Sequence, residues 1–394
     1  MANPIARQTP NQVESFAEIR EAMRALCADY PNEYWRELEK TNAYPDDFVK
    51  VMIENGFLSC LIPEAYGGSG LGLQEAGVIL EELSRSGGHP GACHAQMYTM
   101  GTVLRHGSEE QKQHYLPKIA SGELRLQAFG VTEPDAGTDT TSIKTFARRD
   151  GDDYVVNGRK VFISRAEHSD LMLLLARTTP KDQCQKKSQG MSVFLVDMRD
   201  VLGNGMELQA IDMMMNHHCT EVFFDDMRIP ASSLIGEEGK GFKYILDSMN
   251  AERILIAYEC IGDSKFFIDR ASQYANDRTV FGRAIGQNQG VQFPIARAYT
   301  NMRAAEVMVE TAARKFDAGE SCGEDANIAK LLASEASWAA GDTCLQTHGG
   351  FGFAKEFDIE RKLRETRLYQ VAPISTNLIL SYVSEHVLGL PRSF

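Results

Sequence analysis

Two segments of the sequence combine glycine with polar residues in patterns that could contact a ligand. Residues 131–139 follow a predicted strand, and the proline turn there could direct backbone N–H groups and hydroxyls at a polar ligand; an ordinary capped β-turn has the same composition. Residues 346–353 are rich in glycine, and Gly350 and Gly352 could end a helix or let a ligand approach the backbone. A third glycine-rich segment, residues 68–72, does not complete G-x-G-x-x-G and lies between helical patterns, which favours a loop over a dinucleotide site.

His217, His218 and Cys219 are of the types that bind metal ions. Adjacent side chains in a strand diverge, and no second pair of ligands stands nearby in the sequence, so we expect no metal. The eight cysteines are far apart and form no C-x-x-C pair. This spacing is typical of reduced, mostly buried thiols in a cytoplasmic protein.

The composition bounds the class of protein. The chain has 394 residues, of which 43% are hydrophobic and 24% charged, and this allows two or three domains. The longest apolar runs, residues 171–176 and 254–258, fall far short of the roughly 20 residues that a membrane helix needs. The net charge is −13 without a basic cluster, which argues against a nucleic-acid partner. Residues 1–9 do not resemble a secretory signal.

The hydrophobic pattern changes twice along the chain. It is helical from about residue 11 to 124, has short β-branched and aromatic runs from about 125 to 235, and is helical again from 236 onward. The predicted domains are therefore residues 1–124, 125–235 and 236–394. Long helices are predicted at about 240–278, 288–317 and 323–347, with a last one near 375–388, and such helices pack best as a four-helix bundle. We therefore predict an α+β fold with an N-terminal helical domain, a middle, mostly antiparallel β domain and a C-terminal helical bundle.

A hairpin is predicted inside the β region. Residues 154–156 and 159–163 are strand-like, and Asn157-Gly158 between them is typical of a two-residue turn with positive φ angles. Further strands are predicted at residues 171–175, 191–196 and 221–224.

Seven segments resemble, in order and across nearly the whole chain, those of the acyl-CoA dehydrogenase family. Each segment is only modestly specific, but their common order argues against chance, and the α–β–α order is also the architecture of the family. The segments are residues 62–68, 131–139, 157–164, 222–230, 236–242, 278–282 and 346–352.

The resemblance implies a homotetramer that holds FAD between the β domain and the C-terminal helices. By motif position, the residues expected to line the flavin are Phe129, Val131, Thr132, Gly137 and Thr138. Phe162 stands where many relatives carry Trp against the isoalloxazine, and Ser164 where they carry Thr toward flavin N5, so an aromatic face and a hydroxyl are kept.

A second set of residues is implied for the rest of the cofactor. Arg278, Gln289, Gln346 and Gly350 match positions that bind the FAD pyrophosphate and adenosine across a subunit boundary, and a guanidinium suits a diphosphate. Without the resemblance, Arg278 would be interpreted as a solvated helix residue. The cofactor-binding set is completed by Phe281, Ser375 and Asn377.

The resemblance also implies the catalytic base. Many relatives carry it as Glu near the C-terminus, where this chain has Pro373; a minority, like isovaleryl-CoA and long-chain dehydrogenases, place it on an earlier helix, one residue before an Arg. Glu252 precedes Arg253 there and is the implied base, and Leu255 and Ile256 give it an apolar setting that would raise its pKa. From the residues alone, Glu252 and Arg253 would form a surface pair.

The implied substrate-binding residues are Thr138, Asn250, Arg253 and Ile374. Relatives hold the thioester oxygen with the backbone N–H at the position of Pro373, which has none. Either the Ile374 N–H replaces it, or the thioester lies differently.

The implied reaction is FAD-dependent conversion of an acyl-CoA to the 2-enoyl-CoA, with electrons passed to an electron-transferring flavoprotein. Two alternatives remain open: a flavin oxidase or monooxygenase of the same superfamily, and a non-catalytic protein that binds acyl-CoA or FAD.

Overall fold

The computed structural model describes residues 15–392. They form two compact units, each built from separate stretches of the chain. Unit 1 comprises residues 15–41, 72–90 and 253–392, and unit 2 comprises residues 42–71 and 91–252. No helix in the described part of the chain is both long enough and apolar enough to span a membrane.

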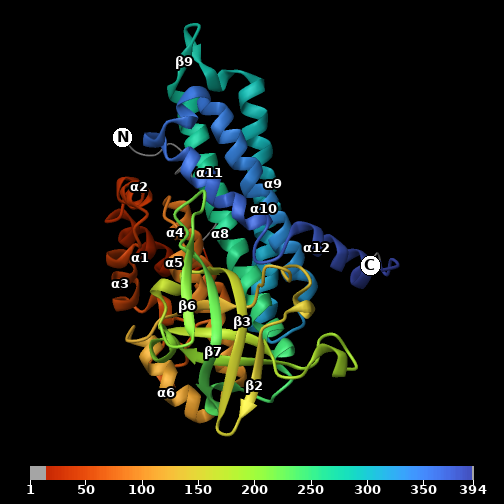
Figure 1. Cartoon of the computed structure of the whole chain (residues 1–394). Coiled ribbons are helices and arrows are strands. Elements are labelled where there is room, and N and C mark those ends of the chain that lie inside the picture. Colours follow the sequence, from red (N-terminus) through yellow and green to blue (C-terminus); the bar gives the residue numbers. More distant parts are fainter. Residues whose placement is uncertain (1–14, 393–394) are drawn as a thin grey trace. The chain divides into compact units, whose positions relative to one another are not determined.

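Unit 2 is built around a mostly antiparallel sheet. Its strands follow the order β6-β7-β3-β2-β4-β5-β8, and β1 lies parallel to β4. Figure 1 labels β6, β7, β3 and β2 of this sheet. The strands are β1 (Leu126–Gly130), β2 (Phe146–Asp150), β3 (Asp153–Ser164), β4 (Leu171–Arg177), β5 (Met191–Asp197), β6 (Met206–Ile211), β7 (Cys219–Pro230) and β8 (Leu234–Ile235). The strands predicted at residues 171–175, 191–196 and 221–224 are thus confirmed.

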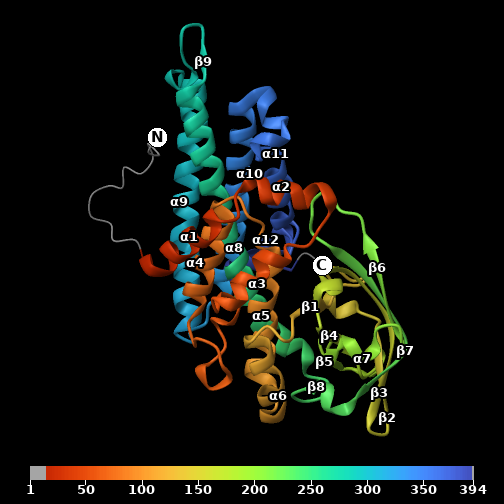
Figure 2. The ribbon, with the colours of Figure 1, turned by 90° about the vertical axis from the view of Figure 1, so that its left-hand side faces the viewer.

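Both faces of the sheet are covered, because β4 is buried at every position. Leu171, Leu173 and Leu175 belong to a core that includes residues of α5 (Gly91–His106) and α6 (Glu109–Ala120), and Figure 2 shows these helices on one side of the strands. Met172 and Leu174 belong to the core on the other face. The remaining helices of unit 2 are α3 (Asp46–Glu54) and α7 (Met198–Val201), with the 3-10 turn η4 (Ala166–His168) after β3.

The hairpin predicted at Asn157-Gly158 is wrong, since both residues lie inside the continuous strand β3. The chain turns instead at Gly151 and Asp152, between paired Asp150 and Asp153. Gly158 is needed for close packing, because a Cβ there would lie 2.6 Å from Thr145 Cα. Asn157 bonds to Asp226 on β7, where the β3–β7 register shifts, so turn-forming residues here serve a β-bulge.

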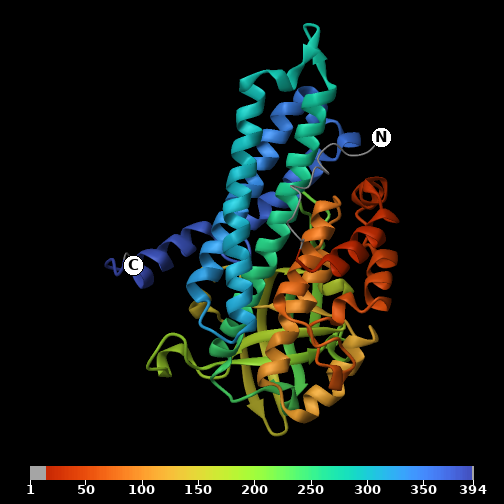
Figure 3. The same cartoon turned by 180° about the vertical axis from the view of Figure 1, so that it is seen from behind.

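Unit 1 is helical. The long helices predicted at 288–317 and 323–347 are confirmed as α9 (Gln289–Asp317) and α10 (Gly323–His348), and Figure 3 shows α9 running beside α8 (Gly241–Asp277), which begins in unit 2 and continues here. The sequence did not reveal α11 (Ile359–Arg367) or the small hairpin of β9 (Thr279–Val280) and β10 (Arg283–Ala284). The other helices are α1 (Ala17–Ala28), α2 (Asn32–Thr41), α4 (Leu73–Arg85) and α12 (Thr376–Tyr382).

A buried cluster of charges joins four helices of unit 1. Arg20 of α1 contacts Glu81 of α4 at 2.9 Å, and Lys265 of α8 contacts both Glu81 at 2.5 Å and Glu306 of α9 at 2.6 Å. Burial alone would raise the pKa of Glu81, but Lys265 and Arg20 together lower it to about 2. The carboxylate is therefore ionised at neutral pH and holds the four helices together.

Candidate functional site

The residues expected to line the flavin lie on adjoining segments of unit 2. Phe129 is in β1, Val131 and Thr132 follow it directly, and Phe162 and Ser164 are at the end of β3. The Val161 N–H donates to the Thr132 carbonyl at 2.9 Å, which joins the loop after β1 to the end of β3.

The exposed groups on these segments fit a flavin. Phe162 lies at an irregularity of the β3–β7 register with φ 57°, and 58% of it is exposed, so the ring face is open to stacking. Ser164 is half-buried, and Gly137 and Thr138 are exposed. A Cβ at Gly137 would meet nothing within 4 Å, so the loop there leaves room for a ligand.

A buried ion pair holds this loop. Lys160 on β3 is fully buried, and its Nζ lies 2.8 Å from Glu133 Oε1 and donates to the Val131 carbonyl at 2.9 Å. Glu133 also accepts the backbone N–H groups of Lys144 (2.6 Å) and Thr145 (3.0 Å). Burial lowers the pKa of Lys160 to about 8, although Glu133 opposes this shift.

His217 and Arg165 form a hydrogen-bonded network with Ser164 that the sequence did not reveal. His217 Nε2 lies 2.9 Å from Ser164 Oγ, and Arg165 Nη2 lies 3.2 Å from His217 Nδ1. Pairing of β3 with β7 creates the network, since Ser164 is opposite Cys219 in the register. The strand pairing spans more than fifty residues, and no local pattern in the sequence indicates it.

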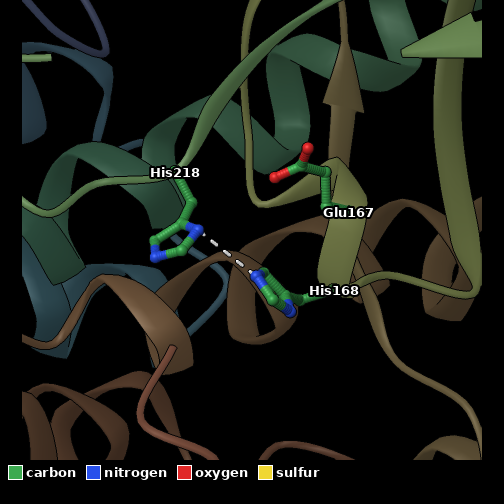
Figure 4. Close-up of side chains that lie close together, drawn as sticks. All are labelled: Glu167, His168 and His218. Atoms are coloured by element: carbon green, nitrogen blue, oxygen red, sulfur yellow. Dashed lines mark hydrogen bonds between the residues drawn. The ribbon is translucent and has the colours of Figure 1, made fainter. Parts of the chain in front are cut away.

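The expectation that His218 has no further ligands nearby needs correction. His168 and Glu167 of η4 lie beside it, with the metal-ligating atoms of all three within 4.8 Å of one another (Figure 4). His168 Nε2 and His218 Nδ1 are 3.3 Å apart, and Tyr44 stacks on His168 at 4.0 Å.

We interpret this group as a hydrogen-bonded histidine pair whose rings meet edge to face, with ring centroids 4.9 Å apart and an angle of 76° between the planes. Burial and then His218 lower the pKa of His168 to about 4, and burial followed by Arg165 lowers the pKa of His218. The charge of Arg165 that opposes protonation also opposes a metal cation.

Glu252 lies on α8 and is buried, with 8% of its surface exposed. Leu255 and Ile256, about one turn further along α8, are 0% and 4% exposed. Glu252 is therefore not the surface residue that its sequence neighbourhood alone suggests. Of the other residues expected at the substrate, Asn250 and Arg253 are half-buried.

A group of the residues expected to bind the rest of FAD gathers at one end of unit 1. Arg278 follows α8 and lies 6.0 Å from the ring of Phe351, just beyond α10. Phe281, next to β9, is 100% exposed with φ 52°, and Arg278, Gln289, Gln346 and Gly350 are exposed too. The glycine with a positive φ after α10 is Gly349 (58°), whereas Gly350 and Gly352 lie in a 3-10 turn, so they are not the left-handed helix cap that the sequence suggested.

Ile374, Ser375 and Asn377 form a separate group at the start of α12. The Ile374 carbonyl accepts a hydrogen bond from buried Lys330 of α10 at 2.6 Å, while its N–H has no acceptor among residues 15–392. Ser375 Oγ caps α12 by accepting the Leu378 N–H at 3.3 Å, and Asn377 is exposed. Lys330 and Gln346 are sixteen residues apart on α10, about 24 Å along the helix, so the two groups do not meet.

One cavity of unit 1 lies apart from both groups. It measures about 620 Å³ and lies between the later part of α8 and α9, with Ile268, Ala275, Ile295 and Met302 in its lining. None of the expected site residues lines it.

Comparison with known proteins identifies the family. Residues 14–123, 128–227 and 239–387 match the N-terminal, middle and C-terminal domains of acyl-CoA dehydrogenase. The chain is 33% identical to acyl-CoA dehydrogenase FadE12 of Mycobacterium tuberculosis over 97% of this chain and 98% of that protein.

Solved structures of similar fold support the same family. Acyl-CoA dehydrogenase from Geobacillus kaustophilus matches with a TM-score of 0.89 and 29% identity over 96% of this chain and 99% of that one. The prolyl acyl carrier protein oxidase AnaB matches with a TM-score of 0.89 and 25% identity over 95% and 98%.

The chain therefore belongs to the acyl-CoA dehydrogenase family and has its helical, β and helical domains. It is an FAD-dependent oxidoreductase that dehydrogenates acyl-CoA.

Proposed function

We propose that the chain converts an acyl-CoA thioester to the 2-enoyl-CoA with Glu252 as the general base, and that the electrons pass to an electron-transferring flavoprotein. Glu252 removes the proton at the α carbon, and FAD supplies the acceptor for the β hydride. Arg253 and Asn250 line the acyl-CoA, together with Thr138 from the loop after β1.

The burial of Glu252 carries this proposal. A general base acts best where bulk water is excluded, and the carboxylate of Glu252 is shielded from solvent in this way. The alternative base position holds Pro373, which has no titratable group. Glu252 is therefore the carboxylate that both the family pattern and its burial favour.

We assign the flavin to the exposed groups of unit 2. Phe162 offers its ring face, Ser164 its hydroxyl, and Val131, Thr132 and Gly137 line the cofactor with Phe129. Arg278, Phe281, Gln289, Gln346 and Gly350 bind the pyrophosphate and adenosine of a cofactor shared with a second subunit, as their exposure favours, and Ser375 and Asn377 complete the set. A homotetramer provides such boundaries.

The thioester oxygen needs a hydrogen-bond donor in place of the one that Pro373 lacks. We assign this role to the Ile374 N–H, which has no acceptor within the described residues, on a segment anchored by Lys330. A donor of this kind is worth about 10²–10³ in rate.

The test is reduction of the bound flavin by a panel of acyl-CoA thioesters without another electron acceptor, followed as bleaching. Glu252→Gln should lower the rate of bleaching by at least about 10²-fold while FAD remains bound. Glu237→Gln, the same change at an exposed position before α8, should bleach at the wild-type rate. Wild-type bleaching in Glu252→Gln would refute the assignment of the base.

An oxidase is the second candidate, favoured by the likeness to the acyl carrier protein oxidase. Oxygen consumption with a bleaching substrate and no other acceptor separates the two: rapid turnover supports the oxidase, and turnover only with an electron-transferring flavoprotein supports the dehydrogenase. The non-catalytic binding protein is set aside, because the chain belongs to a family of oxidoreductases.

A further inference from the structure

Arg165 is a buried cation without a counter-charge among residues 15–392. Its exposed fraction is 3%, and no carboxylate in the described part of the chain forms an ion pair with it. Its Nη1 is buried without a hydrogen-bond partner within residues 15–392. An isolated buried charge is costly to a fold, so a guanidinium in this state calls for a function.

The surroundings of Arg165 do not neutralise it. Burial lowers its pKa, and the acidic groups that oppose this shift are the phenols of Tyr44 and Tyr98 and the thiols of Cys219 and Cys93, which are uncharged at neutral pH. The guanidinium also lies against the first residue of α5, where a Cβ on Gly91 would be 2.0 Å from Nη2. A helix N-terminus carries partial positive charge and disfavours a cation. Arginine nevertheless stays protonated in proteins.

The contacts of Arg165 fix the proton on His217. A guanidinium can only donate, so His217 Nδ1, 3.2 Å from Arg165 Nη2, must accept. The proton of a neutral His217 is then on Nε2, which donates to Ser164 Oγ at 2.9 Å. Ser164 receives a hydrogen bond in this arrangement, and its own proton is free to be donated. The nearest other partner, Cys219 Sγ, is 3.9 Å away and a weak acceptor.

We propose that Arg165, acting through His217, is a positioning residue that holds the Ser164 hydroxyl as a hydrogen-bond donor to the flavin and thereby favours reduction of the cofactor. The inference rests on the proposed place of Ser164 beside flavin N5. A donor at this atom withdraws electron density from the ring, and hydride uptake adds negative charge, which a donor and a nearby cation both stabilise. Without these contacts, the Ser164 hydroxyl could donate either to His217 or to the flavin. Because Arg165 makes His217 Nε2 a donor, only the flavin is left as an acceptor.

The test measures the reduction equilibrium of FAD in the purified holoenzyme against an indicator dye, without acyl-CoA. Arg165→Met should lower the equilibrium constant for reduction at least tenfold, which is about 30 mV for a two-electron couple. Arg165→Lys keeps a cationic donor and should stay within threefold of the wild type. Ser164→Ala should fall at least tenfold as well, and this small change keeps the test available if Arg165→Met does not fold. Flavin absorbance checks that each variant retains FAD.

A double variant tests the route of the effect. If Arg165 acts through Ser164, Arg165→Met combined with Ser164→Ala should lower the constant no further than the larger single change. Additive effects of the two changes would overturn the proposal. So would an equilibrium constant within threefold of the wild type in Arg165→Met, an unchanged constant in Ser164→Ala, or a fall in Arg165→Lys equal to that in Arg165→Met. Since no acyl-CoA is present, a failure of Glu252 as the base would leave these results untouched and would count against the proposed function alone.

Discussion

Breaking the buried ion pair of Lys160 and Glu133 should lower the stability of the protein far more than breaking an exposed salt bridge would. Lys160→Met removes the contacts of Nζ to Glu133 at 2.8 Å and to the Val131 carbonyl at 2.9 Å, and leaves a carboxylate that is only 6% exposed. Removing one partner of a buried pair costs about 3–5 kcal/mol. Glu133→Gln should cost at least about 1–3 kcal/mol, because its NH₂ group must face one of the two backbone N–H groups that the carboxylate accepts.

Urea unfolding followed by far-UV circular dichroism, with FAD in excess, measures these changes. The double variant Lys160→Met with Glu133→Gln buries no charge and should lose about 1–3 kcal/mol less than the sum of the single losses. Lys144→Met is the matched control, since Lys144 pairs with Asp135 at 2.9 Å in the same region with side chains 75% and 74% exposed. It should change stability by less than about 1 kcal/mol. A Lys160→Met protein as stable as this control would refute the reasoning.

Three further predictions concern the site and its surroundings. Phe162→Ala should weaken FAD binding about tenfold and leave the stability of the apoprotein within about 0.5 kcal/mol, measured by FAD titration and urea unfolding, because the ring is 58% exposed; Phe162→Trp should retain affinity. Lys330→Met should lower the rate of flavin bleaching by acyl-CoA by about 10²-fold with FAD retained, because it releases the Ile374 carbonyl; an unchanged rate would exclude the Ile374 N–H as the thioester donor. The pKa of His168 is lowered from 6.5 to about 4, so the unfolded chain binds the proton more tightly than the folded protein. Stability is therefore lost as the pH falls below 6.5, and at pH 5.5 the loss is about 1.4 kcal/mol. In urea unfolding, His168→Phe should lack this part of the pH dependence.

The hydrophobic pattern of the sequence predicted the elements that bury mainly apolar side chains. The long helices α9 and α10 were predicted to within a few residues from the helical period of their apolar residues. The strands β4 and β5 were predicted from short, continuous apolar runs. The helix α11 was missed because its buried side chains include Arg361 and Lys362, which sequence patterns assign to the surface. Lys362 is buried against Asp263 of α8 at 2.8 Å, a contact that depends on tertiary packing.

The prediction for Asn157-Gly158 failed for a related reason. The pair has the local chemistry of a turn, and nothing nearby in the sequence reveals that β7 supplies Asp226 to bond Asn157 or that Thr145 requires a glycine opposite. Contacts with residues far away in the sequence therefore place these turn-forming residues in a β-bulge.

The candidate site also has parts that the sequence predicted and parts that it did not. Motif resemblance selected Ser164 and the loop after β1 as parts of the site. The sequence did not reveal the groups that hold them, because His217 bonds to Ser164 from 53 residues further along the chain and Lys160 bonds to Glu133 from 27 residues further along.

The separation within unit 1 bears on how many chains a cofactor site needs. The pyrophosphate group of FAD is only a few bonds long, yet Gln346 and the Lys330–Ile374 contact lie about 24 Å apart along α10. One diphosphate cannot reach both, so under the proposed assignment Ser375 and Asn377 would bind a different part of the cofactor, or a different cofactor molecule, from Arg278 and Gln346. The full exposure of Phe281 argues for the second case, because none of residues 15–392 covers this aromatic ring at the tip of the hairpin. Each subunit would then serve two flavins, one with each group, and the assembly would be needed to complete every site.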